Sequence, residues 1–278
     1  MLTEVYCRSV LQRSGVPGGD YAINPYSGCA FGCSFCYVRA LRRRRGQEWA
    51  DWGEWAEAKI NAPALLRREM GRISPDARIL IGTATDAWQP VEKRAGITRA
   101  ILEALAECPN PVSVITRSPL VIRDIPVLKK LQSYGGVHVN FSISTFDDAA
   151  RSVFEPRAPR VAGREHAIRR LIDAGIPVTL FWAPILPGVS DSAPAVSEYL
   201  SRAAELGVRR IMAGFLNYRE TMDGRYSALL KAYYEKVPEA RERPGRATMG
   251  RAALQREIEA RAHECGISLL GGESSRDP

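Results

Sequence analysis

The sequence has few histidines and few cysteines. Of its 278 residues, three are histidines and six are cysteines. We do not expect a disulfide framework, because such frameworks belong to short, cysteine-dense secreted chains. A zinc site is not expected either, because outside one short loop these residues are scattered, with no C-x2-C or H-x3-H spacing. The scattered residues are Cys7, Cys108, Cys265, His138, His166 and His263.

Long apolar runs are also missing. No run approaches the roughly 18 residues that a membrane-spanning helix requires. The first residues lack the charged and apolar regions of a secretion signal. We therefore expect a cytoplasmic protein without a membrane partner. The composition, 45% hydrophobic and 25% charged, is ordinary for a globular protein, and the length allows one large α/β domain.

Three cysteines stand close together on one short segment. Cys29, Cys33 and Cys36 follow the spacing C-x3-C-x2-C, and Phe35 precedes the last of them. A cubane 4Fe-4S cluster takes one thiolate per iron, so three thiolates leave one iron open to another ligand. Bacterial ferredoxins use C-x2-C-x2-C with a fourth cysteine just beyond, which this chain does not have. The spacing therefore predicts a 4Fe-4S cluster with one open iron.

Short apolar runs rich in β-branched residues alternate with longer segments of helical periodicity. This alternation predicts a parallel sheet built from βα units. Strands are expected at residues 21–23, 77–82, 112–115, 137–143, 178–182 and 208–212. Helices are expected at 63–70, 91–107, 123–132, 164–174 and 193–206. Six units are fewer than the eight of a closed barrel, so we predict an α/β fold with a partial (β/α)6 barrel.

The chain divides into four expected parts. Residues 1–20 form an N-terminal extension, and residues 21–213 form the barrel core. Residues 214–270 form a helical cap, with helices at 226–237 and 249–263 separated by a charged, proline-containing stretch at 238–246. Residues 271–278 are expected to be a disordered tail.

Polar residues follow several of the predicted strands. Active sites of parallel barrels lie at the carboxyl ends of their strands, so these segments are the ones to examine. They are residues 82–93, 116–118 with 123–124, 142–145 and 183–188.

These segments form an ordered series of motifs along the chain. They read N-P-Y-x-G-C-x-x-x-C-x-F-C-Y, T-D-x-W-Q-P-x-E-K, T-R-S, F-E-P-R-A-P and A-P-I-L-P-G. Over about residues 21 to 190, the series resembles the radical S-adenosylmethionine (SAM) superfamily, and within it the group named after spore photoproduct lyase. The resemblance implies a TIM-like partial barrel of the radical SAM type and an enzyme that uses a 4Fe-4S cluster and SAM.

The activity that the resemblance implies is reductive cleavage of SAM. In this superfamily one electron from the cluster yields methionine and a 5'-deoxyadenosyl radical, which abstracts hydrogen from a substrate. The expected partners are an electron donor such as flavodoxin or ferredoxin and an unidentified substrate. A lyase or another radical-based reaction is compatible with the motifs, and the group does not share one reaction.

The resemblance also implies roles for individual residues. Cys29, Cys33 and Cys36 would bind the cluster, and Phe35 would line the adenine side of SAM. Arg117 stands where this group commonly has a lysine and would reach the SAM carboxylate through a bidentate contact. The alternative for Arg117 is a surface ion pair.

Further SAM contacts are expected at two strand ends. One strand end usually meets the methionine amino group and here carries Thr83, Thr85 and Asp86. Ser142 or Ser144 would lie near the ribose. The alternative is that these hydroxyl groups satisfy nearby backbone groups.

One position departs from spore photoproduct lyase, which repairs DNA. That enzyme uses a cysteine as hydrogen donor on the strand after the cluster loop, and the aligned residue here is Thr83. A hydroxyl cannot replace a thiol in this role because its O–H bond is far stronger. Lesion repair is therefore disfavoured and stays an alternative, with Tyr26, Tyr37 or Tyr218 as other hydrogen donors.

A net charge of +8 is the second indication of a partner. Arg39 and the run Arg42 to Arg45 lie just beyond the cysteine loop and favour a polyanion, so nucleic acid is a possible partner. The alternatives are a solvated helix face for the run and, for the whole chain, a basic nucleic-acid-binding iron–sulfur protein. Trp49, Trp52 and Trp55 recur as on one side of a helix and are expected in the core or in a lid.

Two further residue groups complete the expectations. Asn217, Tyr218 and Arg219 follow the last strand and are candidates for substrate contact. Glu155 and Arg164 are expected to form a structural ion pair, and the alternative for them is a catalytic role.

Overall fold

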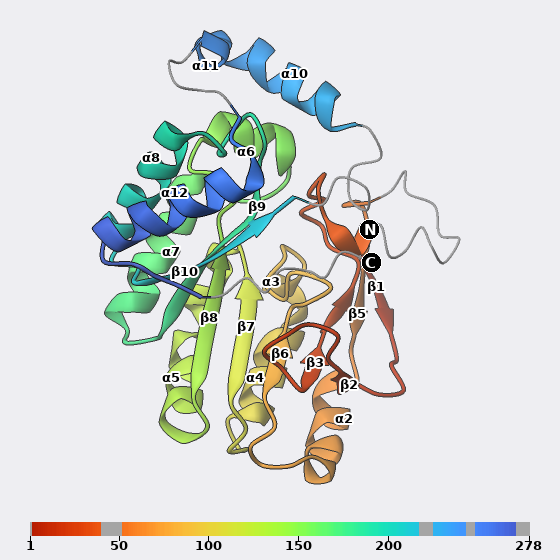
Figure 1. Cartoon of the computed structure of the whole chain (residues 1–278). Helices are drawn as coiled ribbons and strands as arrows, with labels where there is room; N and C mark the ends of the chain where they lie inside the picture. Colours follow the sequence, from red (N-terminus) through yellow and green to blue (C-terminus); the bar gives the residue numbers. More distant parts are fainter. Residues whose placement is uncertain (1, 40–51, 217–224, 243–247, 271–278) are drawn as a thin grey trace.

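A computed structural model describes residues 2–39, 52–216, 225–242 and 248–270. Its centre is an eight-stranded sheet in the order β11-β10-β9-β8-β7-β6-β3-β2 (Figure 1). The strands are β2 (Gln12–Arg13), β3 (Tyr21–Ile23), β6 (Ile79–Ile81), β7 (Val112–Thr116), β8 (Val137–Ser142), β9 (Val178–Ile185), β10 (Arg210–Phe215) and β11 (Ser268–Leu269). The six strands β3 and β6 to β10 are parallel and adjacent in sequence order. The predicted partial barrel with six core strands is confirmed.

Helices between the strands cover the outer face of the sheet (Figure 1). They are α2 (Ala62–Glu69), α3 (Glu92–Ala95), α4 (Ile97–Leu105), α5 (Ile125–Tyr134), α6 (Asp148–Phe154), α7 (Val161–Asp173) and α8 (Ala193–Glu205). In α4 the buried residues recur at helical spacing and include Ile97, Ile101 and Leu105. They pack with strand residues such as Val114 and Val139 in one large apolar core. Burial of these faces is the main force that holds helices and sheet together.

The predicted helix at 91–107 is wrong in one respect, because it is two helices. Gly96 lies between α3 and α4 with φ +65° and serves as C-cap of the first and N-cap of the second. A left-handed residue of this kind ends a helix, and glycine adopts it without steric cost.

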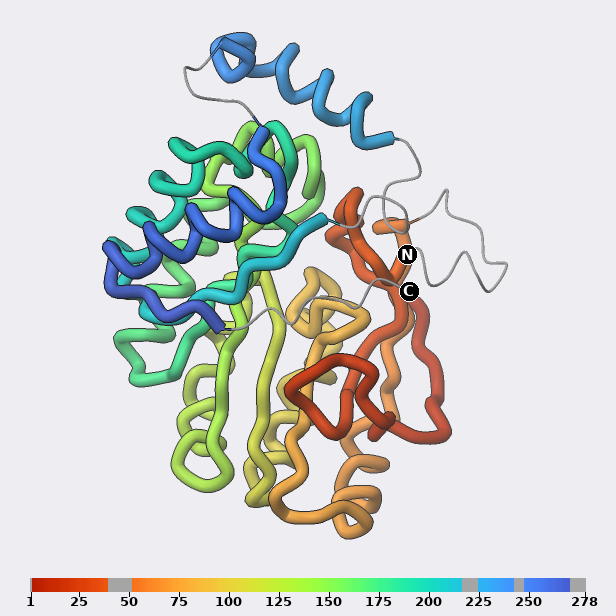
Figure 2. The backbone as a smooth tube through the Cα atoms, in the orientation of Figure 1, coloured from red at the N-terminus to blue at the C-terminus, as the bar shows by residue number. Residues whose placement is uncertain are grey.

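Several short elements were not predicted. A three-stranded sheet has the order β1-β5-β4, formed by β1 (Leu2–Val5), β5 (Ala56–Lys59) and β4 (Tyr26–Ser27). In this sheet β5 lies between the N-terminal strand β1 and β4, which is at the start of the cysteine loop (Figure 2). The 3-10 helix Pro119–Asp124, the helix α6 and the edge strand β11 were missed as well, because such short runs carry little periodicity.

Two predictions about helices need correction. Trp52 lies in a turn and Trp55 directly precedes β5, so these two tryptophans do not share a helix. The stretch that was expected to separate the last helices contains α11 (Pro238–Glu242), where proline begins a short helix as its position in a first turn allows.

The C-terminal helices pack on different parts of the core. The helix α10 (Tyr226–Lys236) lies against α6, and α12 (Arg251–Glu264) lies against α8. Figure 1 shows α10 and α11 beyond the carboxyl ends of the strands. The division of the chain at residues 20 and 213 stays a prediction. Within the described ranges, no helix has the length and apolar character that a bilayer crossing requires.

Candidate active site

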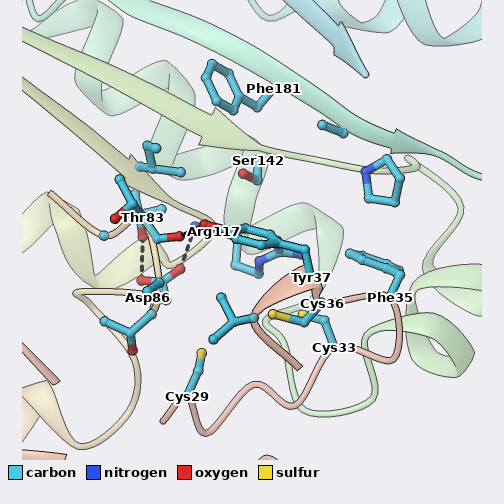
Figure 3. Close-up of a pocket in the computed structure, with 18 of the residues that line it drawn as sticks. Cys29, Cys33, Phe35, Cys36, Tyr37, Thr83, Asp86, Arg117, Ser142 and Phe181 are labelled. Carbon is cyan, nitrogen blue, oxygen red and sulfur yellow. Dashed lines mark hydrogen bonds between the residues drawn. The ribbon is translucent and has the colours of Figure 1, made fainter. Parts of the chain in front are cut away.

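A cavity of about 410 Å³ opens at the carboxyl ends of the core strands. Its wall is built from the cysteine loop, the segment after β6, and the last residues of β7, β8, β9 and β10 (Figure 3). The lining residues that were predicted to bind cofactors are Cys29, Cys33, Phe35, Cys36, Thr83, Thr85, Asp86, Arg117 and Ser142. Because parallel strands end at one edge, residues far apart in the sequence meet here.

All three cysteines of the loop are free thiols that border this cavity. Burial raises the pKa of Cys29 and of Cys33 to about 12 and that of Cys36 to about 11. Buried thiols of this kind become thiolates when a nearby positive charge, such as that of bound iron, compensates the burial. Arg117 provides part of that compensation because its charge lowers the pKa of Cys33.

The arrangement of the three cysteines suits a cluster better than a single metal ion. In the part of the chain that the structure describes, no three His, Cys, Asp or Glu side chains converge as ligands of a metal ion. The cysteines border a common space instead, with Cys29 on one side and Cys33 and Cys36 together on the other (Figure 3). A cluster with one thiolate on each of three irons needs such spread ligands. The residues present fit a 4Fe-4S cluster.

Glycines determine the shape of the cysteine loop. Gly28 has φ +78°, and a Cβ atom there would lie 2.6 Å from the ring of Trp55. Gly32 has φ +58°, and its Cβ atom would lie 3.0 Å from the Cα atom of Gly53. Left-handed backbone and close approach both favour glycine. The turn at residues 52–55 therefore holds the loop from outside, which the sequence pattern did not reveal.

The Asp86 carboxylate organises the segment after β6. Its Oδ1 atom accepts hydrogen bonds from the backbone N–H of Trp88 at 2.9 Å and from the hydroxyl of Thr116 at 2.8 Å. Its Oδ2 atom accepts from the backbone N–H of Arg117 at 2.8 Å. Burial raises the pKa of Asp86, and these donors oppose that change. Asp86 thus ties the strand ends of β6 and β7 together while it faces the cavity.

Thr83 and Thr85 make different contacts. The Thr83 hydroxyl accepts a hydrogen bond from the Asn24 amide at 3.0 Å, and the Thr83 carbonyl accepts one from the Tyr37 hydroxyl. The Thr85 hydroxyl donates to the carbonyl of Gly28 at 2.5 Å. Both residues line the cavity, and both satisfy backbone or side-chain groups of the loop region.

Arg117 belongs to a buried ionic group with Glu155 and Arg164. Its Nη1 atom lies 3.1 Å from Glu155 Oε2, and its side chain is 16% exposed. Glu155 also forms an ion pair with Arg164, so the expected structural pair is confirmed. Burial alone would raise the pKa of Glu155, but Arg164 and Arg117 outweigh it and hold that pKa at about 2. The alternative of a surface ion pair for Arg117 is wrong, because Glu155 is 1% exposed.

The two serines differ in position. Ser142 is the last residue of β8 and lines the cavity. Ser144 is fully buried, does not line the cavity, and its hydroxyl lies 3.4 Å from the carbonyl of Ala183. The Phe35 ring lies near the Arg117 guanidinium, 5.8 Å from its carbon to the ring centre.

Some predicted residues fall elsewhere. Asn217, Tyr218, Arg219, Trp49 and the run Arg42 to Arg45 lie outside the described residues. Trp52 lines the cavity. Of the described tyrosines that were named as hydrogen donors, Tyr37 lines the cavity, whereas Tyr26 does not and donates to the Glu92 carboxylate.

Sequence reasoning missed two parts of the site. One is an apolar wall from β9 and the end of β10, made by Phe181, Phe215 and Leu216 beside Pro184 of the expected segment 183–188. The other is Gln89, which lies in the quoted T-D-x-W-Q-P motif and is fully buried against the cysteine loop. The apolar wall could have been predicted from the apolar residues at the ends of the expected strands. No sequence signal gives the direction of the Gln89 side chain.

The protein has an open parallel barrel with a cysteine loop at the carboxyl ends of its strands. This combination is typical of barrel enzymes that use a cofactor. A model of the radical SAM superfamily matches residues 23–200. Since the match covers more than half of the chain, the protein belongs to the radical SAM superfamily. The family implies a 4Fe-4S cluster, SAM, a substrate and an electron donor. The protein is therefore a radical SAM enzyme.

The chain is also similar to two uncharacterised proteins and to a solved structure of spore photoproduct lyase. An uncharacterised protein of Mycobacterium tuberculosis is 28% identical over 247 residues, which cover 86% of this chain and 72% of that protein. An uncharacterised protein of Methanocaldococcus jannaschii is 28% identical over 190 residues, covering 68% and 70%. A mutant spore photoproduct lyase with bound AdoMet and dinucleoside spore photoproduct superposes with a TM-score of 0.66 at 14% identity, covering 96% and 81%. This last likeness shows that the fold is that of spore photoproduct lyase.

Proposed function

We propose that Cys29, Cys33 and Cys36 hold a 4Fe-4S cluster with one open iron, and that SAM occupies the adjoining part of the cavity. The observation that carries the proposal is the position of three free thiols in the same cavity as the polar strand ends. With one electron from a donor such as flavodoxin or ferredoxin, the bound cofactors would supply methionine and a 5'-deoxyadenosyl radical that abstracts hydrogen from the substrate.

Four residues of the chain are proposed to orient SAM. Arg117 would bind its carboxylate, since a guanidinium fits a carboxylate with two parallel hydrogen bonds. Within the described residues the Nη1 atom of Arg117 makes an ion pair with Glu155 but no hydrogen bond. The guanidinium group therefore has hydrogen-bonding capacity left for a ligand. Thr83 and Asp86 would meet the amino group, and Ser142 the ribose. Ser142 is preferred over Ser144 because it lines the cavity.

Phe35 and Thr85 are assigned less directly. Phe35 is proposed to line the adenine side, which its place in the cavity wall supports. The only proton of the Thr85 hydroxyl is donated to Gly28, so Thr85 would offer SAM an acceptor lone pair and no donor. Asn217, Tyr218 and Arg219 stay candidates for substrate contact on sequence grounds alone.

The reaction is proposed to differ from DNA-lesion repair. Thr83 stands at the position of the lyase's hydrogen-donating cysteine, and its hydroxyl is engaged by Asn24. Among the residues that the structure describes, Tyr37 is the tyrosine that lines the cavity, and it could return a hydrogen atom to a substrate radical. A nucleic-acid substrate stays a prediction that rests on the net charge of +8. A cytoplasmic location is proposed because the cluster and free thiols suit a reducing compartment.

The test is cleavage of SAM. Protein reconstituted anaerobically with iron and sulfide, then given dithionite and SAM, should release 5'-deoxyadenosine. Cys33→Ala should abolish release, whereas Cys108→Ala, on a thiol outside the cavity, should leave it unchanged. Loaded protein that releases none, or a Cys33→Ala variant that releases as much as the wild type, would refute the proposal.

A further inference from the structure

A buried amide side chain holds the backbone on both sides of Cys29. The Gln89 Oε1 atom accepts a hydrogen bond from the backbone N–H of Ala30 at 2.7 Å. Its Nε2 atom lies 3.3 Å from the carbonyl of Gly28 and 3.0 Å from the Thr85 hydroxyl, and it donates to both. Gln89 is 0% exposed, so water does not compete for these bonds.

The Gln89 and Thr85 contacts form one closed network. The Thr85 hydroxyl donates its single proton to Gly28 O and accepts from Gln89 Nε2. The Gly28 carbonyl thus receives two hydrogen bonds, and the Ala30 amide is bound by a third. Cys29 lies between these two anchored residues. The network therefore holds the backbone on both sides of Cys29.

Gln89 and Asp86 lie in the same turn but bind different parts of the structure. Both carboxylate oxygens of Asp86 accept hydrogen bonds, from Thr116, Trp88 and Arg117. These bonds connect the strand ends of β6 and β7. Gln89 is the next polar residue along the same turn, and its longer amide reaches the loop instead. On the other side of the loop, Gly28 lies close to Trp55, since a Cβ atom at Gly28 would stand 2.6 Å from the Trp55 ring.

We propose that Gln89, together with Thr85, is a positioning residue that fixes Cys29 as a cluster ligand. This inference rests on the proposed function, because it requires Cys29 to bind iron. Partners that orient metal ligands contribute strongly to retention of the metal, and their loss typically costs about 10–100-fold in affinity. Cys29 is the ligand to which this applies, since Cys33 and Cys36 lie beyond the anchored residues.

The experiment measures iron release from anaerobically reconstituted protein to a ferrous chelator. Gln89→Met removes all three hydrogen bonds at similar volume and should speed release about 10–100-fold. Thr85→Val should also speed it, whereas Thr85→Ser, which keeps the hydroxyl, should restore slow release. Asn110→Leu is the matched control, because Asn110 is 3% exposed and its amide donates to two carbonyls at the amino ends of the strands.

The controls separate a positioning role from a merely structural one. Urea unfolding of the cluster-free proteins should show that Gln89→Met and Asn110→Leu both lower stability, while only Gln89→Met releases iron faster. If Gln89→Met releases iron at the wild-type rate, or Asn110→Leu releases it equally fast, the inference is overturned. If Cys29→Ser holds iron as firmly as the wild type, the proposed function itself fails, so the two failures are distinguishable.

Discussion

The buried carboxylate of Glu155 offers a test of the ionic group behind the site. It is 1% exposed and lies between Arg164, which is fully buried, and Arg117. Glu155→Gln removes the negative charge at almost constant volume and leaves two guanidinium cations facing each other. Breaking a buried ion pair from one side costs about 3–5 kcal/mol, because the remaining charge is uncompensated.

The stability cost of Glu155→Gln can also be estimated from the pKa of Glu155. Its ordinary value of 4.5 is lowered to about 2 in the folded protein, where Arg164 and Arg117 outweigh the effect of burial. Such a difference corresponds to about 3 kcal/mol of stability. A lowered carboxyl pKa stabilises the fold above pH 4.5, and the contribution is lost as pH falls toward 2. At neutral pH the wild-type protein therefore has the full contribution.

The assay is urea unfolding of cluster-free protein at pH 7, followed by circular dichroism. Glu155→Gln should lower the free energy of unfolding by about 3–5 kcal/mol. The control is Glu205→Gln, whose pair with Arg202 is exposed, with side chains 60% and 45% accessible. That change should cost less than about 1 kcal/mol. Equal effects of the two substitutions would refute the idea that burial makes the Glu155 group stabilising.

Three further predictions concern other parts of the protein. Arg117→Gln should raise the KM for SAM much more than it lowers kcat, measured as 5'-deoxyadenosine release; an unchanged KM would remove Arg117 from SAM binding. Burial and Arg210 lower the pKa of His138 to about 4 from 6.5, so protonation of the unfolded state should cost about 2 kcal/mol of stability between pH 7.5 and pH 5. His138→Gln should abolish that loss in urea unfolding, and an unchanged pH dependence would contradict it. Gly28→Ala should lower the iron content after reconstitution, because its Cβ atom would collide with Trp55, whereas Gly71→Ala, with open space around it, should not; equal iron contents would argue against a tightly held loop.

Elements with a strong local signal were predicted well. The strand Tyr21–Ile23 was predicted with the observed bounds, and the helix Ala193–Glu205 differs by one residue at its end. Their apolar spacing and end signals lie within the element itself. The break at Gly96 and the helix Asp148–Phe154 were missed, because the helices concerned have only four and seven residues and such short helices carry little periodicity.

The candidate site shows the same division. The apolar residues Phe181 and Phe215 gave no sign of a shared wall, because they belong to different strands that only the sheet brings together. Arg117 was singled out as a candidate, but its pairing with Glu155 was not, since an ion pair depends on the mutual orientation of two side chains.

The sequence by itself determined the cofactor chemistry and the fold class. The three cysteines lie within residues 29–36, so their spacing is a local property, and the alternating βα pattern repeats along the chain. Only the tertiary structure decided what surrounds Cys29. Gln89, Thr85 and Trp55 reach it because strand order and a left-handed glycine bring distant backbone together. A hydrogen bond requires a short distance and a suitable angle between its atoms, and the order of the residues alone specifies neither.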